Sequence, residues 1–79
     1  MHTVELISRP GCHLCADAKA VVARVCADLG AEWTEVDLAD RPELLDEYWE
    51  KVPVVLVDGR LLSFWHVHEQ PLRKAILAP

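Results

Sequence analysis

The stretch RPGCHLCADAKA, residues 9–20, contains two cysteines three positions apart at a point where a loop turns into a helix. The segment Arg9–Pro10–Gly11 ends the strand predicted before it, and apolar residues at helical spacing follow the cysteines. Such a pair can be a redox centre, half of a metal site, or two small residues at the start of a helix. The spacing alone does not decide among these interpretations, so the surrounding sequence has to.

Length and composition indicate one small globular domain spanning residues 1–79. The chain is 52% hydrophobic and 27% charged, as is ordinary for a globular protein. Eight basic and thirteen acidic side chains give a net charge of −5, which argues against general nucleic-acid binding. We find no signal sequence, long apolar run or basic amphipathic segment, and therefore expect a cytoplasmic protein that does not bind membranes.

Hydrophobic periodicity predicts the element order βαβαββα. The predicted strands are residues 3–8, 32–38, 52–57 and 60–64, and the predicted helices are residues 12–29, 41–49 and 68–77. The first two strands, joined through a helix, are expected to be parallel, whereas Asp58–Gly59 signals an antiparallel hairpin. The sequence therefore predicts an α/β fold with a four-stranded mixed sheet and helices on both faces.

Cys12 is positioned to act as a thiolate, the reactive form in thiol–disulfide exchange. It lies at the predicted start of the first helix, where unpaired backbone N–H groups and the helix dipole favour negative charge. Arg9 and His13 can add positive charge beside it, although His13 can equally be a plain surface residue. Cys15 lies one turn further along the helix, where it can resolve a mixed disulfide formed on Cys12.

A metal site is the competing chemical interpretation of the cysteine pair. Structural zinc takes four ligands, and the chain has no second C-x-x-C motif. His13, His66 and His68 would complete a site only if folding happened to bring them together. We therefore expect no metal.

The chain combines a strand, a C-x-x-C pair opening the first helix, a Val-Pro before the third strand and a glycine after that strand. This pattern resembles the glutaredoxin branch of the thioredoxin fold, over essentially the whole chain. The residues that carry the resemblance are Cys12, His13, Leu14, Cys15, Val52, Pro53 and Gly59. The resemblance implies a thioredoxin-like fold in which the Val52–Pro53 bond is cis and its loop packs beside the cysteines. The backbone of Val52 would then pair with an extended substrate.

The chain departs from typical glutaredoxins at three places. His-Leu separates the cysteines where Pro-Tyr is usual, and Lys51 replaces the threonine before Val-Pro. The stretch LLSFWHVHEQP, residues 61–71, lacks the Gly-Gly and acidic residue that hold the γ-glutamyl end of glutathione. We expect either glutathione or a thioredoxin-reductase-like enzyme as the electron donor. No metal or organic cofactor is required, because the cysteine pair carries the electrons.

The predicted function is thiol–disulfide oxidoreduction by a monomer acting on a protein or low-molecular-weight disulfide. Cys12 is the expected nucleophile and Cys15 the resolving residue. The expected substrate-binding residues are Val52, Pro53, His13, Arg9 and Trp65. The alternative is a non-catalytic thioredoxin-fold module that binds a partner around Trp65 while the cysteines stay idle.

Several other residues are expected to serve the fold. Cys26 lies about 16 Å along the helix from Cys15, too far to bridge, and is predicted to be a buried structural residue. Trp33 and Trp49 are assigned to packing. Asp40 and Glu43 are predicted to form a capping box at the start of the second helix.

Overall fold

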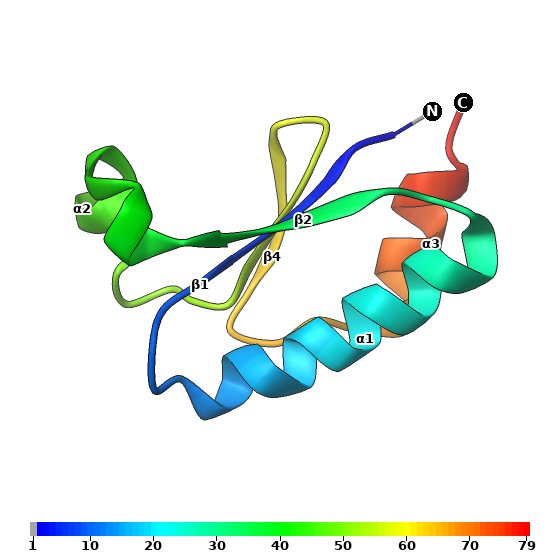
Figure 1. The fold of residues 1–79 in the computed structure, drawn as a ribbon. Helices are drawn as coiled ribbons and strands as arrows, with labels where there is room; N and C mark the ends of the chain where they lie inside the picture. Colours follow the sequence, from blue (N-terminus) through cyan, green and yellow to red (C-terminus); the bar gives the residue numbers. More distant parts are fainter. Residues whose placement is uncertain (1) are drawn as a thin grey trace.

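A computed structural model describes residues 2–79 and shows a sheet flanked by helices (Figure 1). The order βαβαββα is confirmed, and so is the α/β class. The elements are β1 Val4–Ser8, α1 His13–Leu29, β2 Trp33–Asp37, α2 Leu45–Tyr48, β3 Val54–Val57, β4 Arg60–Phe64 and α3 Glu69–Leu77. Within residues 2–79 none of these helices has both the length and the apolar composition needed to cross a bilayer.

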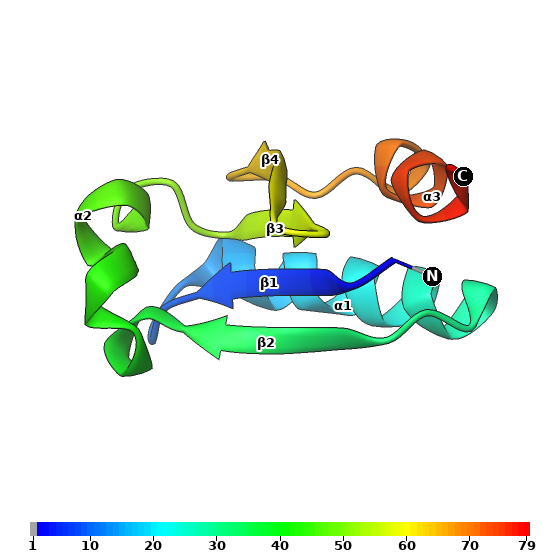
Figure 2. The same cartoon turned by 90° about the horizontal axis from the view of Figure 1, so that it is seen from above.

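The four strands form one mixed sheet in the order β2-β1-β3-β4 (Figure 2). β1 runs parallel to β2, with Val4 opposite Trp33, and antiparallel to β3, with Val4 opposite Val57. β3 and β4 form the predicted antiparallel hairpin. The central strand β3 is apolar on both faces, as expected of a strand covered from two sides, whereas β1 carries Glu5 among its apolar residues. The third strand begins at Val54 because Val52 and Pro53 belong to the preceding loop.

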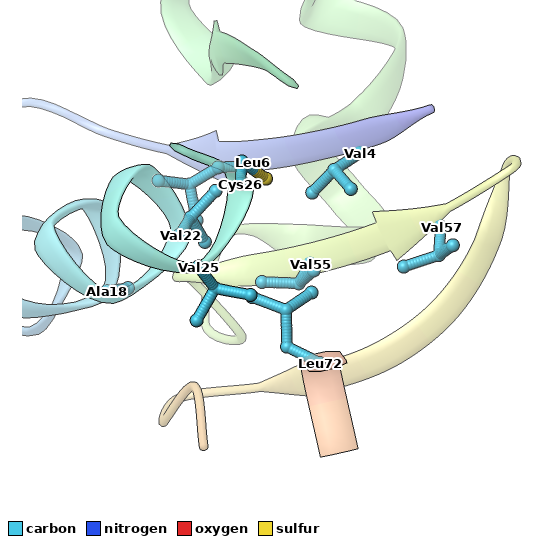
Figure 3. Close-up of a cluster of buried hydrophobic side chains, with 9 residues drawn as sticks. All are labelled: Val4, Leu6, Ala18, Val22, Val25, Cys26, Val55, Val57 and Leu72. Atoms are coloured by element: carbon cyan, nitrogen blue, oxygen red, sulfur yellow. The ribbon is translucent and has the colours of Figure 1, made fainter. Parts of the chain in front are cut away.

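Helices α1 and α3 lie on the same face of the sheet (Figure 1). They cover the side chains at alternate positions of β1 and β3, and α1 contributes residues at three- and four-residue steps. The buried cluster between these helices and the sheet is drawn in Figure 3. It consists of Val4, Leu6, Ala18, Val22, Val25, Cys26, Val55, Val57 and Leu72. This cluster is the main core of the domain.

A second buried cluster lies around the end of the sheet where β1 leaves it, with Ile7 and Val54 on the face opposite α1 and α3. Its members are Ile7, Cys15, Leu38, Val52 and Val54. Partly buried side chains from the segment around α2 pack against it, namely Leu44, Leu45 and Tyr48. Helical structure therefore lies on both faces, as predicted, and the smaller cluster joins the sheet to the cysteines.

The predicted helix over residues 41–49 is wrong in its extent. The chain forms two 3₁₀ turns, Leu38–Asp40 and Pro42–Leu44, before the short helix α2. Pro42 disfavours helical geometry at Arg41, which has φ −132° and ψ 69°, and so a continuous helix cannot run through this point.

The predicted capping box in this segment is also wrong. Asp37 provides the cap instead, because its carboxylate accepts a hydrogen bond from the Ala39 N–H at 2.8 Å. Glu43 pairs with Arg41 at 2.7 Å, which holds the pKa of the Glu43 carboxyl below its ordinary value. The two carboxylates therefore stabilise turns and surface contacts and do not cap a helix jointly.

Left-handed backbone geometry occurs at the points where the sequence predicts sharp turns. Gly30 ends α1 with φ 67°, the usual geometry of a C-terminal cap. Asp58 and Gly59 have φ 54° and 78°, as the tight turn of a two-residue hairpin requires. The Asp58 carboxylate also accepts a hydrogen bond from the Thr3 N–H at 2.8 Å, which ties the hairpin to the start of β1.

Candidate functional site

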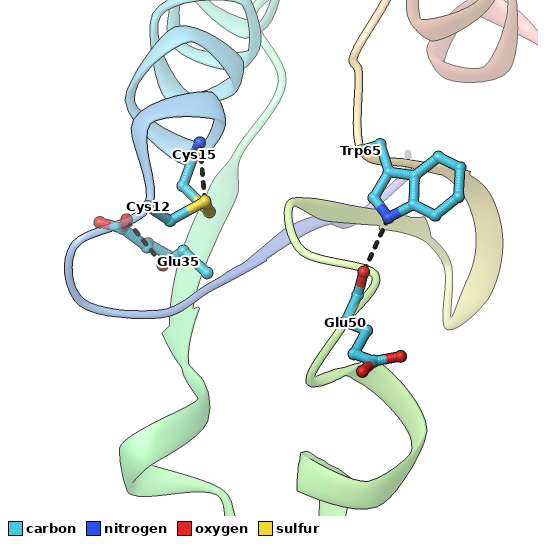
Figure 4. The surroundings of a disulfide bond; sticks show 6 residues. Cys12, Cys15, Glu35, Glu50 and Trp65 are labelled. Atoms are coloured by element: carbon cyan, nitrogen blue, oxygen red, sulfur yellow. Dashed lines mark hydrogen bonds between the residues drawn. A yellow bond between two sulfur atoms is a disulfide. The ribbon is translucent and has the colours of Figure 1, made fainter.

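The two cysteines lie at the junction between the β1–α1 loop and helix α1, and they form a disulfide (Figure 4). Cys12 is the N-cap residue, with extended geometry at φ −92° and ψ 111°. Its sulfur accepts a hydrogen bond from the Cys15 N–H at 3.2 Å. The Cα atoms are 5.2 Å apart, within the usual range for a bridged pair. The expected position of Cys12 at the helix N-terminus is therefore found.

The two sulfurs differ in their access to solvent. Cys12 is half-buried, whereas Cys15 is only 5% exposed. Cys15 belongs to the smaller core cluster together with Val52, and Cys12 packs against the same cluster. An incoming disulfide can reach Cys12 from outside, while Cys15 approaches it from the protein side.

The loop before β3 lies beside the cysteines, as the resemblance implied. The Val52–Pro53 peptide bond is cis, and both residues are buried. Among residues 2–79, neither the N–H nor the C=O of Val52 takes part in a backbone–backbone hydrogen bond. Neither group is therefore committed to the sheet or to a turn. Whether Val52 and Pro53 bind substrate stays a prediction.

A pocket of about 370 Å³, called here the cysteine pocket, opens at the disulfide. The residues lining it include Arg9, Cys12, His13, Cys15, Lys19 and Glu35. Arg9 and His13, both predicted from the sequence, thus lie around the disulfide, with His13 exposed at the first position of α1. Their roles in binding or in thiolate stabilisation stay predictions.

Glu35 and Lys19 are polar residues of the cysteine pocket that the sequence analysis missed. Glu35, on β2, pairs with Lys19 at 3.1 Å and accepts a hydrogen bond from the Ser8 hydroxyl at 3.1 Å. Figure 4 shows Glu35 close to the disulfide. Two signals were available: strand alternation puts Glu35 on the same side as Trp33, and Lys19 follows Cys15 by four residues on α1.

Arg9 links the cysteine pocket to an exposed tryptophan. Its guanidinium carbon lies 4.6 Å from the centroid of the Trp49 ring, a cation–π arrangement. Trp49 is 48% exposed, so its assignment to packing is wrong. Trp49 is the C-cap residue of α2, and its ring lies on the surface under the Arg9 guanidinium.

Trp65 lies at the same end of the sheet as the disulfide (Figure 4). The strand register explains this, because Ile7 pairs with Val54 and Val54 with Phe64, so residues just beyond these positions leave the sheet together. The Trp65 N–H donates to the carbonyl of Lys51 at 3.1 Å and to that of Pro53 at 2.9 Å.

The Trp65 ring is held in place although it does not line the cysteine pocket. Its indole N–H donates to the Glu50 carbonyl at 2.7 Å, and its φ is 69°. Left-handed geometry at a tryptophan costs on the order of 1–3 kcal/mol, so surrounding contacts must compensate. The side chain is 51% exposed, so it does not close the core.

Cys26, His66 and His68 take no part in the disulfide. Cys26 is 1% exposed, and burial raises the pKa of its thiol, which confirms its structural assignment. His66 and His68 are both exposed, with ring centroids 6.4 Å apart. Within residues 2–79 no group of three or more histidine, cysteine or acidic side chains is arranged to hold a metal ion.

Comparison with known proteins adds sequence relatives to this geometry. The sequence model of a family described as "Glutaredoxin-like domain (DUF836)" matches residues 3–77. Uncharacterized proteins of Mycobacterium bovis and Mycobacterium tuberculosis are each 36% identical to this chain over 78 residues. In both cases the match covers 92% of this chain and 80% of the relative.

Solved structures share the arrangement of strands and helices. The solution structure of a Nitrosomonas europaea protein, Ne2328, superposes with a TM-score of 0.76 at 19% identity, covering 90% of this chain and 86% of that one. Thioredoxin 1 of Thermosipho africanus superposes with a TM-score of 0.67 at 13% identity, covering 94% of this chain and 89% of that one. These structures support the thioredoxin-like fold.

Proposed function

Because the chain belongs to the family of glutaredoxin-like domains and has a thioredoxin-like fold, we propose that it is a dithiol–disulfide oxidoreductase. The observation that carries the proposal is the unequal placement of the two sulfurs. Cys12 is accessible at the helix N-terminus, and the nearly buried Cys15 directs its N–H toward the Cys12 sulfur. This arrangement suits one cysteine to attack and the other to resolve.

The reaction begins with the reduced protein. The Cys12 thiolate attacks one sulfur of a substrate disulfide, which forms a mixed disulfide and releases the second substrate sulfur as a thiolate. The Cys15 thiolate then attacks the Cys12 sulfur and releases the remaining substrate thiolate. The two substrate thiolates take up the two protons, so the substrate gains two electrons and the protein ends with the Cys12–Cys15 disulfide.

The Val52–Pro53 loop is the proposed binding surface for the substrate backbone. The free N–H and C=O of Val52 support it, because an extended chain can pair with them beside Cys12. We propose that the substrate chain paired with Val52 also contacts Arg9, His13 and Trp65. Protein disulfides and low-molecular-weight disulfides both fit the proposal.

The electron donor is proposed to be glutathione or a thioredoxin-reductase-like enzyme, either of which would restore the dithiol. No metal or organic cofactor enters the reaction as proposed. We propose that the protein is a monomer located in the cytoplasm. The location is supported by the cysteine content, because one close cysteine pair and one buried thiol suit a reducing compartment.

A second candidate function is a non-catalytic binding module. The half-exposed Trp65 ring favours it, since a fixed aromatic on the surface is a common anchor for a partner. In that case the cysteines would contribute no chemistry, and their replacement would leave the activity of the protein intact.

Equilibration in a series of glutathione redox buffers, with intact mass as the readout, tests the proposal. We expect the Cys12–Cys15 disulfide to form and break across the series. Cys15→Ser should accumulate a mixed disulfide on Cys12, and Cys12→Ser should react with no added disulfide. Cys26→Ser is the matched control and should retain the Cys12–Cys15 couple. Full activity of Cys12→Ser would contradict the catalytic function.

A further inference from the structure

A second pocket, of about 760 Å³, shares none of its lining residues with the cysteine pocket. We call it the tryptophan groove. Its lining includes Asp46, Glu47, Trp49, Glu50, Lys51 and Trp65. These residues come from α2, from the segment that leads to β3, and from the position just after β4.

Trp65, which lines one side of the groove, is hydrogen-bonded to the backbone of the segment that leads to β3. Trp65 is bound at its main-chain N–H by the carbonyls of Lys51 and Pro53, and at its indole N–H by the carbonyl of Glu50. The Phe64 ring packs against it in a T-shaped arrangement, with the ring centroids 5.0 Å apart. A ring held at both ends yet half-exposed offers a pre-ordered face to a ligand.

The groove is connected to the disulfide through Arg9. This residue lines the cysteine pocket, and its guanidinium lies over the Trp49 ring of the groove. A polypeptide that presents its sulfur to Cys12 and contacts Arg9 can therefore extend toward the groove. A neighbouring side chain of that polypeptide can enter it.

Charge indicates which side chain would fit. Within residues 2–79, no ion pair within 4.0 Å involves the groove carboxylates Asp46, Glu47 and Glu50. Lys51 is the one cation among the residues that line the groove. Carboxylates combined with exposed indole rings are the groups that hold a lysine or arginine. Arg9 on Trp49 is an example within the same molecule.

We propose that the tryptophan groove binds a lysine or arginine side chain of a protein substrate, close in sequence to the cysteine that Cys12 attacks. The inference rests on the proposed oxidoreductase function and names the substrate class, a polypeptide with a basic segment at its disulfide. Glutathione carries two carboxylates and one ammonium group, and it lacks the side chain that the groove accepts.

Single-turnover kinetics with peptide–thionitrobenzoate mixed disulfides test this inference. The reduced full-length protein is mixed with peptides of one sequence that carry lysine, glutamine or glutamate at the positions flanking the cysteine. Release of thionitrobenzoate gives the second-order rate constant for each peptide. We expect the lysine peptide to react fastest and the glutamate peptide slowest, with a ratio that falls as salt rises.

Paired variants separate the groove from the general negative charge of the protein. In Asp46→Asn/Glu50→Gln the lysine-to-glutamate rate ratio should fall by roughly 1.5- to 5-fold for each carboxylate removed. Asp17→Asn/Glu32→Gln changes the net charge equally at exposed positions outside the groove, and it should keep a ratio close to that of the unchanged protein.

The outcomes also distinguish the inference from the function on which it rests. Reaction with all peptides at equal rates, or an equal loss of the ratio in both double variants, would overturn the inference and leave the oxidoreductase intact. A faster glutamate peptide would do the same and would point to Lys51 and Arg9 as an anion site. No reaction with any peptide, in protein whose Cys12 is shown to be reduced, would overturn the proposed function itself.

Discussion

Replacing Leu38 by alanine tests whether the smaller core cluster holds Cys15 in its buried position. Leu38 is fully buried in the 3₁₀ turn after β2 and shares a cluster with Cys15 and Val52. Leu72 of α3 is equally buried, but it belongs to the main core on the opposite face. Leu38→Ala and Leu72→Ala therefore remove the same atoms from the two sides of the sheet.

The two substitutions should destabilise the protein by similar amounts. Three carbons withdrawn from the core correspond to about 2.4 kcal/mol of transfer free energy, and the residual cavity raises the total to about 2.5–5 kcal/mol. A domain of this length has a free energy of unfolding of roughly 4–12 kcal/mol. Urea unfolding of the reduced proteins, followed by circular dichroism, measures the loss. If an alanine variant is unfolded, the pair Leu38→Val and Leu72→Val provides the comparison.

Alkylation of the reduced proteins separates local packing from global stability. We expect iodoacetamide to modify Cys15 several-fold faster in Leu38→Ala than in Leu72→Ala, because only the former opens space in the cluster that contains Cys15. Peptide mass mapping distinguishes Cys15 from Cys12 and Cys26. Equal acceleration in both variants would mean that Cys15 reacts through global unfolding. The assignment of Leu38 as a support for the cysteine pair would then be refuted.

Three further predictions concern groups away from the disulfide. His2 has a raised pKa because it is hydrogen-bonded to the Ala78 carbonyl and to Asp58, whose pKa is lowered by the same contact. The stabilisation from His2 is therefore full below its unfolded pKa of 6.5 and is lost as pH rises through the folded value, whereas that from Asp58 is lost as pH falls below 3.8. The Tm difference between the protein and His2→Ala should be largest between these limits. Cys26→Ser should lower the free energy of unfolding by about 1–3 kcal/mol in urea titrations, because it buries a hydroxyl. Gly30→Ala should cost about 1–2 kcal/mol in the same titrations, since alanine is disfavoured at φ 67°.

The sequence predicts the fold well wherever a local pattern has one outcome. Alternating apolar residues in β1, the helical spacing in α1 and the Asp58–Gly59 turn each lead to the observed structure. The segment between β2 and β3 was misread because its acidic residues suit a helix N-terminus as well as a turn. The backbone restriction that Pro42 imposes on Arg41 decided between these outcomes.

The candidate site was predictable only in its backbone frame. The position of Cys12 at the helix start followed from the apolar spacing after it, and the neighbouring Val52–Pro53 loop followed from the resemblance to glutaredoxins. The Lys19–Glu35 pair and the contact of Arg9 with Trp49 did not, because each joins side chains from different elements. Such contacts depend on the register and twist of the sheet, which a single sequence does not specify residue by residue.

Chemistry and selectivity would reside in different parts of this chain. The register of β1, β3 and β4 brings the ends of these strands together, and that pairing depends on main-chain hydrogen bonds. The Cys12 helix start, the Val52 loop and Trp65 therefore meet at one end of the sheet whichever side chains surround them. The groove carboxylates lie outside this frame, on exposed positions of α2 and the segment after it, and can change without disturbing it. Substitutions at Asp46 and Glu50 should accordingly alter which disulfides react, while substitutions at Cys12 or Cys15 should abolish the reaction with all of them.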